Sequence, residues 1–254
     1  MQRFAVLCFG LVTYALFLAA FLYAVLFVEG LWVPRTLDAG GTLGSAGTAA
    51  AIDVLLLGLF AVQHSVMARP AFKARWTRVV HPASERSTFV LATAVVLGLI
   101  FRFWRPIPAV VWDVEGAAAT LLRGLSWAGF GLVLVATFVI DHFELFGLKQ
   151  TLRHARGLPV ESPRFQVRFF YRYTRHPLYL GFFIAFWSAP TMTAGHLLFS
   201  AVVSAYVLVA VRLEERDLVA EHGEAYEEYR RRVPRILPLG RRPAAELAQR
   251  RPPG

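Results

Sequence analysis

The chain has 254 residues, of which 56% are hydrophobic and 17% are charged. Soluble globular domains contain about 45–50% apolar and about 25% charged residues, so the composition favours several membrane-spanning helices over one large soluble core. The net charge of +10 comes from basic residues in alternate loops, which is typical of membrane proteins and argues against nucleic-acid binding. The single cysteine, Cys8, excludes an intramolecular disulfide and a cysteine metal cluster.

Apolar runs near or above about 18 residues, the length that crosses a bilayer, recur along the chain. The first, Phe4–Val28, is too long for the apolar core of a typical signal peptide, and further runs follow it. We therefore expect a retained helix. The later runs are Ala51–Ala68, Ser87–Phe101, Leu125–Phe146 and a broken stretch over 178–213.

The stretch over 178–213 is interrupted by Pro190 and Gly195. Its first arm has about a dozen residues, which gives a helix of about 20 Å, shorter than the roughly 30 Å hydrocarbon core. The stretch is therefore either a re-entrant helical hairpin or two tilted spans.

The distribution of Lys and Arg predicts the topology, because these residues favour cytoplasmic loops. The loops over 69–86 and 147–175 carry five and seven basic residues, whereas those over 29–50 and 102–123 carry one and three. This difference places both termini on the cytoplasmic side, together with the inner ends of the second and fourth spans.

These features predict an all-α fold, a polytopic integral membrane helical bundle of five to six membrane helices. Residues 213–232 are polar, with apolar and tyrosine side chains at helical spacing, so we expect a cytoplasmic C-terminal amphipathic helix that ends at Val233-Pro234. We assign residues 1–240 to one membrane domain. The Pro-, Ala- and Arg-rich tail over 241–254 is expected to be disordered.

The predicted topology brings distant polar residues to one depth in the cytoplasmic leaflet. They are His64 near the end of the second span, Asp141, His142 and Glu144 in the last turns of the fourth, His176 and Tyr179 where the hairpin begins, and Glu214-Glu215 where it ends. Ionisable groups at membrane depth are costly and usually face a partner or a cavity. Simple extension of each side chain toward the headgroups is the alternative. We therefore predict a site at the cytoplasmic membrane surface.

The most informative motif is Arg175-His176-Pro177-Leu178-Tyr179-Leu180-Gly181. It is followed, after the apolar hairpin, by Glu214-Glu215 and then by Gly223, Tyr226, Tyr229 and Pro234. This pattern resembles that of the isoprenylcysteine carboxyl methyltransferase and phospholipid N-methyltransferase group of membrane enzymes. The motifs over 63–70, 104–106, 141–148 and 195–199 look like those of the bacterial methanethiol S-methyltransferase family, and this resemblance extends from about Tyr14 to Pro238.

The resemblance implies an enzyme that binds S-adenosylmethionine as methyl donor on the cytoplasmic side of the bacterial inner membrane, without a Rossmann domain. The implied cofactor-binding part is 171–238. Its residues are Arg175, His176, Pro177, Tyr179, Gly181, Glu214, Glu215, His222, Tyr226 and Tyr229. Carboxylates and aromatic faces suit the cations of this cofactor, and a helix that starts at Pro177 suits its carboxylate. The implied substrate is methanethiol and the product dimethyl sulfide.

Methyl transfer to a thiol needs the thiolate, and thiols with a pKa of about 8.5 are mostly protonated at neutral pH. Asp141, His142 or His64 could take the proton, and the sequence leaves the choice open. The implied substrate pocket contains Phe143, Glu144, Leu145 and Trp187, whose apolar members suit a small apolar thiol.

Other functions remain open at this point. The acceptor could be another thiol, a prenylated cysteine carboxylate or a lipid amine. The scaffold also resembles haem-associated membrane proteins linked to nitric-oxide metabolism, in which His64, His142 or His176 would bind iron, and a non-catalytic scaffold is the third alternative. We expect a small thiol and membrane lipid as partners and no metal ion, and the oligomeric state is open.

Overall fold

The computed structural model describes residues 1–42, 44–159 and 167–239. Five helices in this part of the chain are long and apolar enough to cross a membrane, with mean hydropathy between 1.6 and 2.4 over their most apolar windows. They are α1 (Gln2–Glu29), α2 (Ala46–Ala68), α4 (Pro82–Phe103), α5 (Gly116–Ile140) and α9 (Ala194–His222). The predicted helical membrane bundle is confirmed, whereas the predicted tail over 241–254 lies outside the described residues.

Shorter elements connect and flank these helices. They are α3 (Pro70–Trp76), β1 (Val110–Asp113), α6 (His142–Leu145), α7 (Leu148–Ala155), η1 (Phe169–Arg172), α8 (Pro177–Trp187), β2 (Thr191–Thr193) and α10 (Glu224–Arg232). Gly223, with φ 56° and ψ −132°, separates α9 from α10, a conformation that glycine adopts without steric cost. The polar residues from 213 to 222 therefore extend a membrane helix instead of opening a separate one.

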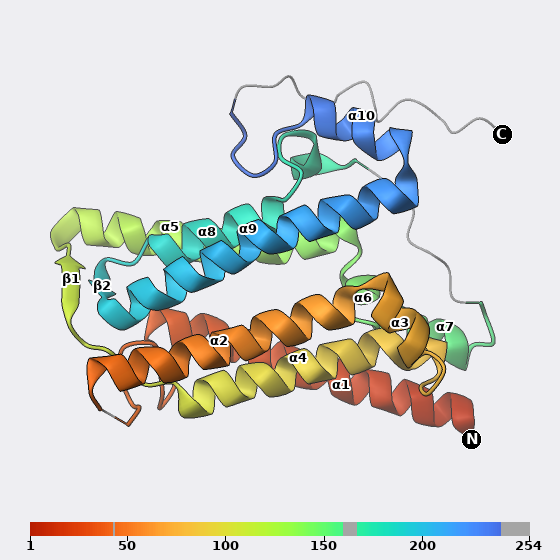
Figure 1. The fold of residues 1–254 in the computed structure, drawn as a ribbon, viewed down its shortest axis with the longest axis horizontal. Helices are drawn as coiled ribbons and strands as arrows, with labels where there is room; N and C mark the ends of the chain where they lie inside the picture. The colour runs from red at the N-terminus through yellow and green to blue at the C-terminus, as the bar shows by residue number, and fades with distance from the viewer. Residues whose placement is uncertain (43, 160–166, 240–254) are drawn as a thin grey trace.

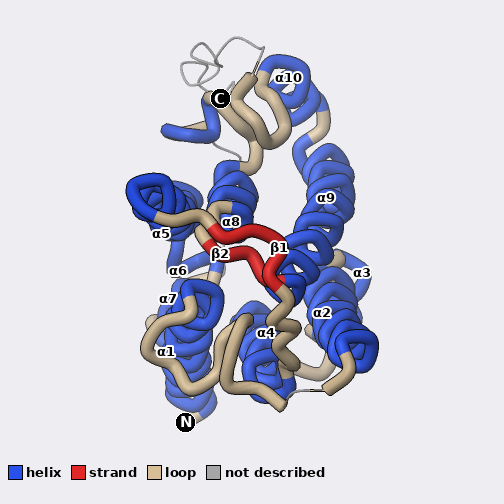
Figure 2. The backbone as a smooth tube through the Cα atoms, turned by 90° about the vertical axis from the view of Figure 1, so that its left-hand side faces the viewer, coloured by secondary structure: helices blue, strands red, loops and turns tan. Residues whose placement is uncertain are grey.

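The helices form two layers (Figure 1). One layer contains α1, α2 and α4, and the other contains α5, α8 and α9. The N-terminus, α3, α7 and α10 lie at one end of the bundle (Figures 1 and 2). We call it the cavity end, because residues of α3, α7 and α10 line a cavity there. The two strands lie at the other end, which we call the sheet end (Figures 1 and 2). Because successive long helices alternate in direction, both ends of the described chain reach the cavity end, as the sequence predicts.

The two strands form a small antiparallel sheet that the sequence did not predict. Val110 pairs with Thr193 and Asp113 with Thr191. The pairing joins the loop between α4 and α5 to the turn between α8 and α9, so their backbone groups are satisfied at the sheet end. A buried apolar core, with Phe27, Trp104 and Phe130 among its members, lies between the helices next to this sheet.

The helix α8 has only 11 residues, about 16 Å in length, and its last turn packs against other elements near the sheet end. Its terminal carbonyl oxygens are satisfied by side chains of other elements, as a helix end away from water requires. Ser126 Oγ donates to Ala185 O at 2.8 Å, and Ser200 Oγ donates to Phe186 O at 2.9 Å. The stretch over 178–213 is thus one short helix followed by one long spanning helix.

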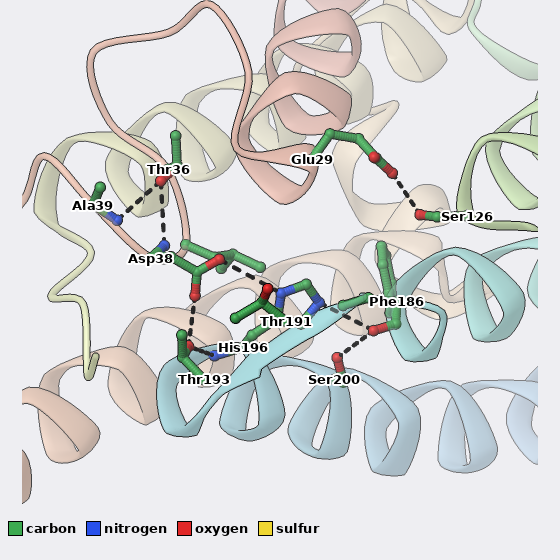
Figure 3. Close-up of polar contacts among 12 residues, drawn as sticks. Glu29, Thr36, Asp38, Ala39, Ser126, Phe186, Thr191, Thr193, His196 and Ser200 are labelled. Carbon is green, nitrogen blue, oxygen red and sulfur yellow. Dashed lines mark hydrogen bonds and ion pairs between the residues drawn. The ribbon is translucent and has the colours of Figure 1, made fainter. Parts of the chain in front are cut away.

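A polar cluster at the sheet end ties α9 to the loop after α1 (Figure 3). The hydroxyl of Thr193 donates to Asp38 at 2.5 Å and also accepts from the backbone N–H of His196, which caps α9. His196 Nδ1 lies 3.8 Å from the Asp38 carboxylate, and Nε2 is 3.1 Å from Phe186 O. Because this cluster also contacts the last turn of α8, it fixes the three segments that meet at the sheet end.

Candidate functional site

A cavity of about 1090 Å³ lies at the cavity end, and its wall combines segments from most of the chain. Its residues come from α3, α4, the end of α5, α6, α7, η1, the start of α8, α9 and α10. Eleven of the residues predicted from the sequence line it: Asp141, His142, Phe143, Glu144, Leu145, Arg175, His176, Glu214, His222, Tyr226 and Tyr229. The fold therefore brings together residues that are up to 88 positions apart, between Asp141 and Tyr229.

Glu215 lies behind the wall and is 2% exposed. Its Oε1 is 3.1 Å from both Arg175 Nη2 and His176 Nε2, and its Oε2 is 3.1 Å from Arg235 Nη2. A buried carboxylate is costly unless it is paired, and here three basic side chains surround it. Glu215 is thus placed to hold Arg175 and His176 at the wall, and Arg235 was not predicted to take part.

Glu214, the neighbour of Glu215, faces the cavity. Its Oε2 accepts a hydrogen bond from Tyr179 Oη at 2.9 Å and lies 3.9 Å from His176 Nδ1. Tyr179 does not line the cavity itself, so its role in the structure is to orient the Glu214 carboxylate.

Arg175 is 7% exposed and lines the cavity. Its Nη2 is paired with Glu215, but Nε and Nη1 have no hydrogen-bond partner among the described residues. Burial lowers the pKa of Arg175 from its ordinary value, and the Glu215 carboxylate acts in the opposite direction. A buried guanidinium with two unused nitrogens can hold a carboxylate of a ligand.

Asp141 is not in a helix, although the sequence predicted that the fourth span continues through it. The helix α5 ends at Ile140, and Asp141 has φ 145°. Its Oδ1 accepts from Glu144 N at 3.1 Å, and Lys149 Nζ lies 2.5 Å from its Oδ2 and 2.7 Å from Glu144 Oε2. The side chain thus caps α6 instead of extending α5.

The Lys149 ammonium changes the proton affinity of this pair. Burial acts to raise the pKa of Asp141, but the hydrogen bonds from Lys149 and from Glu144 N outweigh it and hold the pKa below its ordinary value. The same two carboxylates raise the pKa of Lys149. Asp141 is therefore ionised at pH 7, and Lys149 balances its charge. This makes Asp141 a weak proton acceptor.

His142 is 5% exposed at the wall, and both of its ring nitrogens are hydrogen-bonded within the protein. Nε2 lies 2.8 Å from Tyr14 Oη, and Nδ1 lies 2.8 Å from Thr137 Oγ1. Burial lowers the pKa of His142, and Asp141 acts in the opposite direction. Tyr14, on α1, was not among the predicted site residues.

Four other predicted residues do not line the cavity. His64 lies between the rings of Phe60 and Phe89, at centroid distances of 5.2 and 4.8 Å. Phe89 also carries Arg86 over its ring at 5.0 Å, and Arg86 does line the cavity. His64 is therefore packed behind this wall, whereas Pro177 occupies the first position of α8 and is buried.

Gly181 and Trp187 have structural positions on α8. A Cβ atom at Gly181 would lie 2.7 Å from Gly129 O, so the two helices α5 and α8 pack backbone to backbone at this point. Trp187 ends α8, about 15 Å along the helix from Pro177, and its Nε1 donates to Ser204 Oγ at 2.9 Å. Trp187, which we predicted to contact the substrate, is not among the residues that line the cavity.

Several wall residues were missed by the sequence analysis. They are Lys73, Pro82, Glu85, Arg86, Phe138, Val139, Ile140, Lys149, Gln150, Arg153, Arg168, Tyr171 and Leu218. Most are basic or apolar residues of loops and helix ends, where such residues also occur without any site. The nearest signal was the basic loop over 147–175, which was interpreted only as a topology marker.

The fold and the cavity define a polytopic helical membrane protein with a polar site at one end. Residues 56–233 match a family described as "Protein of unknown function (DUF1295)". The chain is 47% identical to Methanethiol S-methyltransferase 2 of Bradyrhizobium diazoefficiens over 254 residues, which cover 99% of this chain and 98% of that protein. It is 49% identical to Methanethiol S-methyltransferase of Mycobacterium tuberculosis over 239 residues, covering 94% and 98%.

A more distant match is Nurim of Rattus norvegicus, 35% identical over 180 residues, which cover 65% of this chain and 66% of that protein. No solved structure matches the chain. The family match over 56–233 and the near full-length identity show that the chain belongs to the DUF1295 family, in the group of membrane methyltransferases that contains these bacterial proteins.

Proposed function

We propose that this protein transfers a methyl group from S-adenosylmethionine to methanethiol, with dimethyl sulfide as product. The cavity and the termini then lie on the cytoplasmic side of the bacterial inner membrane, as the distribution of basic residues predicts. The observation that carries the proposal is a cavity wall that contains both the His176 motif and the Glu214 motif, in a chain 47–49% identical to two proteins named for this reaction.

The wall residues suit the functional groups of this methyl donor. Arg175 has two unpartnered guanidinium nitrogens for a carboxylate. The carboxylates of Glu85 and Glu214 line the same cavity and suit an ammonium group and a sulfonium group. Tyrosine rings, which suit a nucleobase or a cation, come from Tyr171 and Tyr229.

The apolar part of the wall suits a small apolar acceptor. Phe138, Ile140 and Phe143 line the cavity and are also 56%, 50% and 46% exposed. Phe138 and Ile140 belong to the end of α5, which is a candidate membrane span, and Phe143 belongs to α6, which follows it. A thiol that dissolves in lipid can therefore meet the apolar part of the wall without first crossing its charged part.

When bound, the donor supplies a methyl carbon on a sulfonium sulfur, which is open to in-line displacement. Arg175, Glu214 and the tyrosine rings would hold and orient it, and alignment of this kind contributes much of the rate of such a reaction. The apolar residues at the end of α5 would exclude water from the acceptor. The haem alternative has less support, because both ring nitrogens of His142 and Nε2 of His176 already have protein partners.

The test is to incubate purified protein in lipid with methyl-labelled S-adenosylmethionine and methanethiol and to measure volatile labelled dimethyl sulfide. We expect label in dimethyl sulfide and loss of donor binding in Arg175→Ala. The matched control is Arg172→Ala, because Arg172 is an exposed arginine in η1. Parallel reactions with a longer thiol, a prenylated cysteine and a phospholipid amine identify the acceptor.

If label appears only in one of those other acceptors, that acceptor replaces methanethiol in the proposal. An absorption spectrum with a Soret band and no methyl transfer to any acceptor would reject it in favour of a haem protein.

A further inference from the structure

The proposed reaction needs a group that accepts the thiol proton, and the paired carboxylates of the wall are poorly suited. Asp141 and Glu144 share the ammonium of Lys149. Of the other two bases that the sequence left open, His64 lies behind the wall and His142 lines the cavity. His142 is therefore the candidate, provided that its ring presents a usable lone pair.

The hydrogen bonds of His142 have directions that follow from counting protons. We assign the single hydrogen of Thr137 Oγ1 to its 2.7 Å contact with Leu134 O, which makes Thr137 the acceptor at its 2.8 Å contact with His142 Nδ1. His142 then carries its hydrogen on Nδ1, and the neutral ring has its lone pair on Nε2. Tyr14 Oη, 2.8 Å from Nε2, is the donor to that lone pair.

This arrangement closes direct access to the His142 lone pair. Nε2 is already bonded to Tyr14, whereas Tyr14 Oη accepts no hydrogen bond from any described residue. The Tyr14 ring is half-buried and lies 6.0 Å, centroid to centroid, from Phe143, which lines the cavity. Tyr14 itself is not among the residues that line the cavity. Proton transfer to this chain of hydrogen bonds therefore requires the thiol to reach the Tyr14 oxygen at the edge of the cavity, next to Phe143.

The surroundings of His142 favour a neutral, fixed ring. Phe138 stacks on it at 4.2 Å with an interplanar angle of 6°, and Phe146 meets it edge-on at 4.9 Å. The titratable groups that face it are Tyr14 from α1 and Asp141, which is itself paired with Lys149 from α7. Burial holds the pKa of His142 below its ordinary value of 6.5, so the ring is neutral at pH 7 and can accept a proton.

We propose that Tyr14 and His142 form a proton relay for the acceptor thiol, in which Tyr14 Oη takes the thiol proton and passes its own proton to His142 Nε2. The S–H bond breaks as an O–H bond forms at Tyr14, and the former O–H bond breaks as an N–H bond forms at Nε2. The thiol becomes a thiolate, His142 becomes an imidazolium, and Tyr14 stays neutral. The proton on His142 returns to water after the product leaves. Thr137 is a positioning residue, because it fixes the hydrogen of His142 on Nδ1.

The relay rests on the proposed function and is tested with Tyr14→Phe, which removes the hydroxyl and keeps the ring. We expect kcat at pH 7 to fall about 100-fold or more, as for loss of a general base, with donor binding unchanged. The rate of the variant rises with pH toward the wild-type rate, since the thiol then ionises in water. The matched control is Tyr23→Phe on the same helix. The Tyr23 hydroxyl donates to Arg35 O near the sheet end, so we expect this variant to keep wild-type activity.

A second measurement does not depend on turnover. Nitrogen NMR of histidine-labelled protein, assigned with a His142→Gln variant, reports which ring nitrogen of His142 carries hydrogen. We expect the Nδ1–H form, conversion to imidazolium when methanethiol is added with the demethylated donor, and no conversion in Tyr14→Phe. Thr137→Val is expected to populate the other tautomer, and Thr137→Ser to restore Nδ1–H.

The outcomes separate the relay from the reaction. Dimethyl sulfide formation by the wild type with an unchanged rate in Tyr14→Phe overturns the relay alone, as does an equal loss at every pH or hydrogen on Nε2. No methylation of methanethiol by the wild type overturns the proposed function, and the relay is rejected with it.

Discussion

The substitution Glu215→Gln tests the buried ion cluster that holds the motif at the cavity. It keeps the size of the side chain and removes its charge, so Arg175, His176 and Arg235 lose their shared carboxylate. The contacts differ in burial, because the Arg175 and His176 side chains are 6% and 4% exposed and that of Arg235 is 45% exposed. The buried contacts therefore dominate the expected effect.

Removing one partner of a buried ion pair costs about 3–5 kcal/mol, whereas an exposed pair contributes about 0–1 kcal/mol. We expect Glu215→Gln to lower the free energy of unfolding by about 3 kcal/mol, most of it from the buried contacts with Arg175 and His176. The assay is unfolding in detergent, followed by tryptophan fluorescence. The matched control, Glu228→Gln, removes an exposed pair with Arg232 on α10 and should change stability by less than about 1 kcal/mol.

A stability loss in Glu215→Gln no larger than that of the control would refute this reasoning. It would mean that Arg175 finds another partner or water when Glu215 is neutral. In that case the two unpartnered nitrogens of Arg175 would also lose their significance as a carboxylate site.

Two further predictions concern packing and pH. Gly181→Ala places a methyl group 2.7 Å from Gly129 O and should lower the free energy of unfolding by about 1–3 kcal/mol, as overpacking does. The control Gly131→Ala on α5 should not, because a Cβ atom there has nothing within 4 Å. Equal melting temperatures of the two variants would contradict the close α5–α8 contact. Lys149→Met should raise the pKa of Asp141, which is depressed in the wild type. A depressed carboxyl pKa stabilises the fold above the ordinary value of 3.8 and stops doing so as the pH falls through the lower folded value. The stability difference between wild type and Lys149→Met, measured by unfolding from pH 7 to pH 3, should therefore shrink at the acidic end; a constant difference would show that Lys149 acts by packing alone.

The sequence predicted the membrane helices well because length and apolar composition largely decide which segments cross a bilayer. It also predicted that the His176 and Glu214 motifs meet at one end, since spans that alternate in direction return to the same side. It failed at Asp141, where hydrogen bonds to Glu144 N and Lys149 stabilise a non-helical residue at φ 145°. Both partner residues are present in the sequence nearby, but nothing in the local pattern indicates that the helix ends before Asp141.

The roles of single residues depended on contacts across the fold. Glu214 and Glu215 are adjacent in one motif, yet one faces the cavity and the other is buried among three basic side chains. Neighbouring positions on a helix point about 100° apart, so their surroundings depend on which helices pack on each side. The motif itself does not contain that information.

The amino-acid sequence alone predicted five to six membrane helices and the end of the bundle where most of the motif residues gather. Apolar length decides which segments can cross a bilayer, and spans that alternate in direction return to the same side. Only the tertiary structure decided which side chain pairs with which. Tyr14 meets His142 across 128 positions, and Thr137 lies 2.8 Å from the other ring nitrogen. Hydrogen-bond directions are set by partners in space, which the order of residues along the chain does not specify.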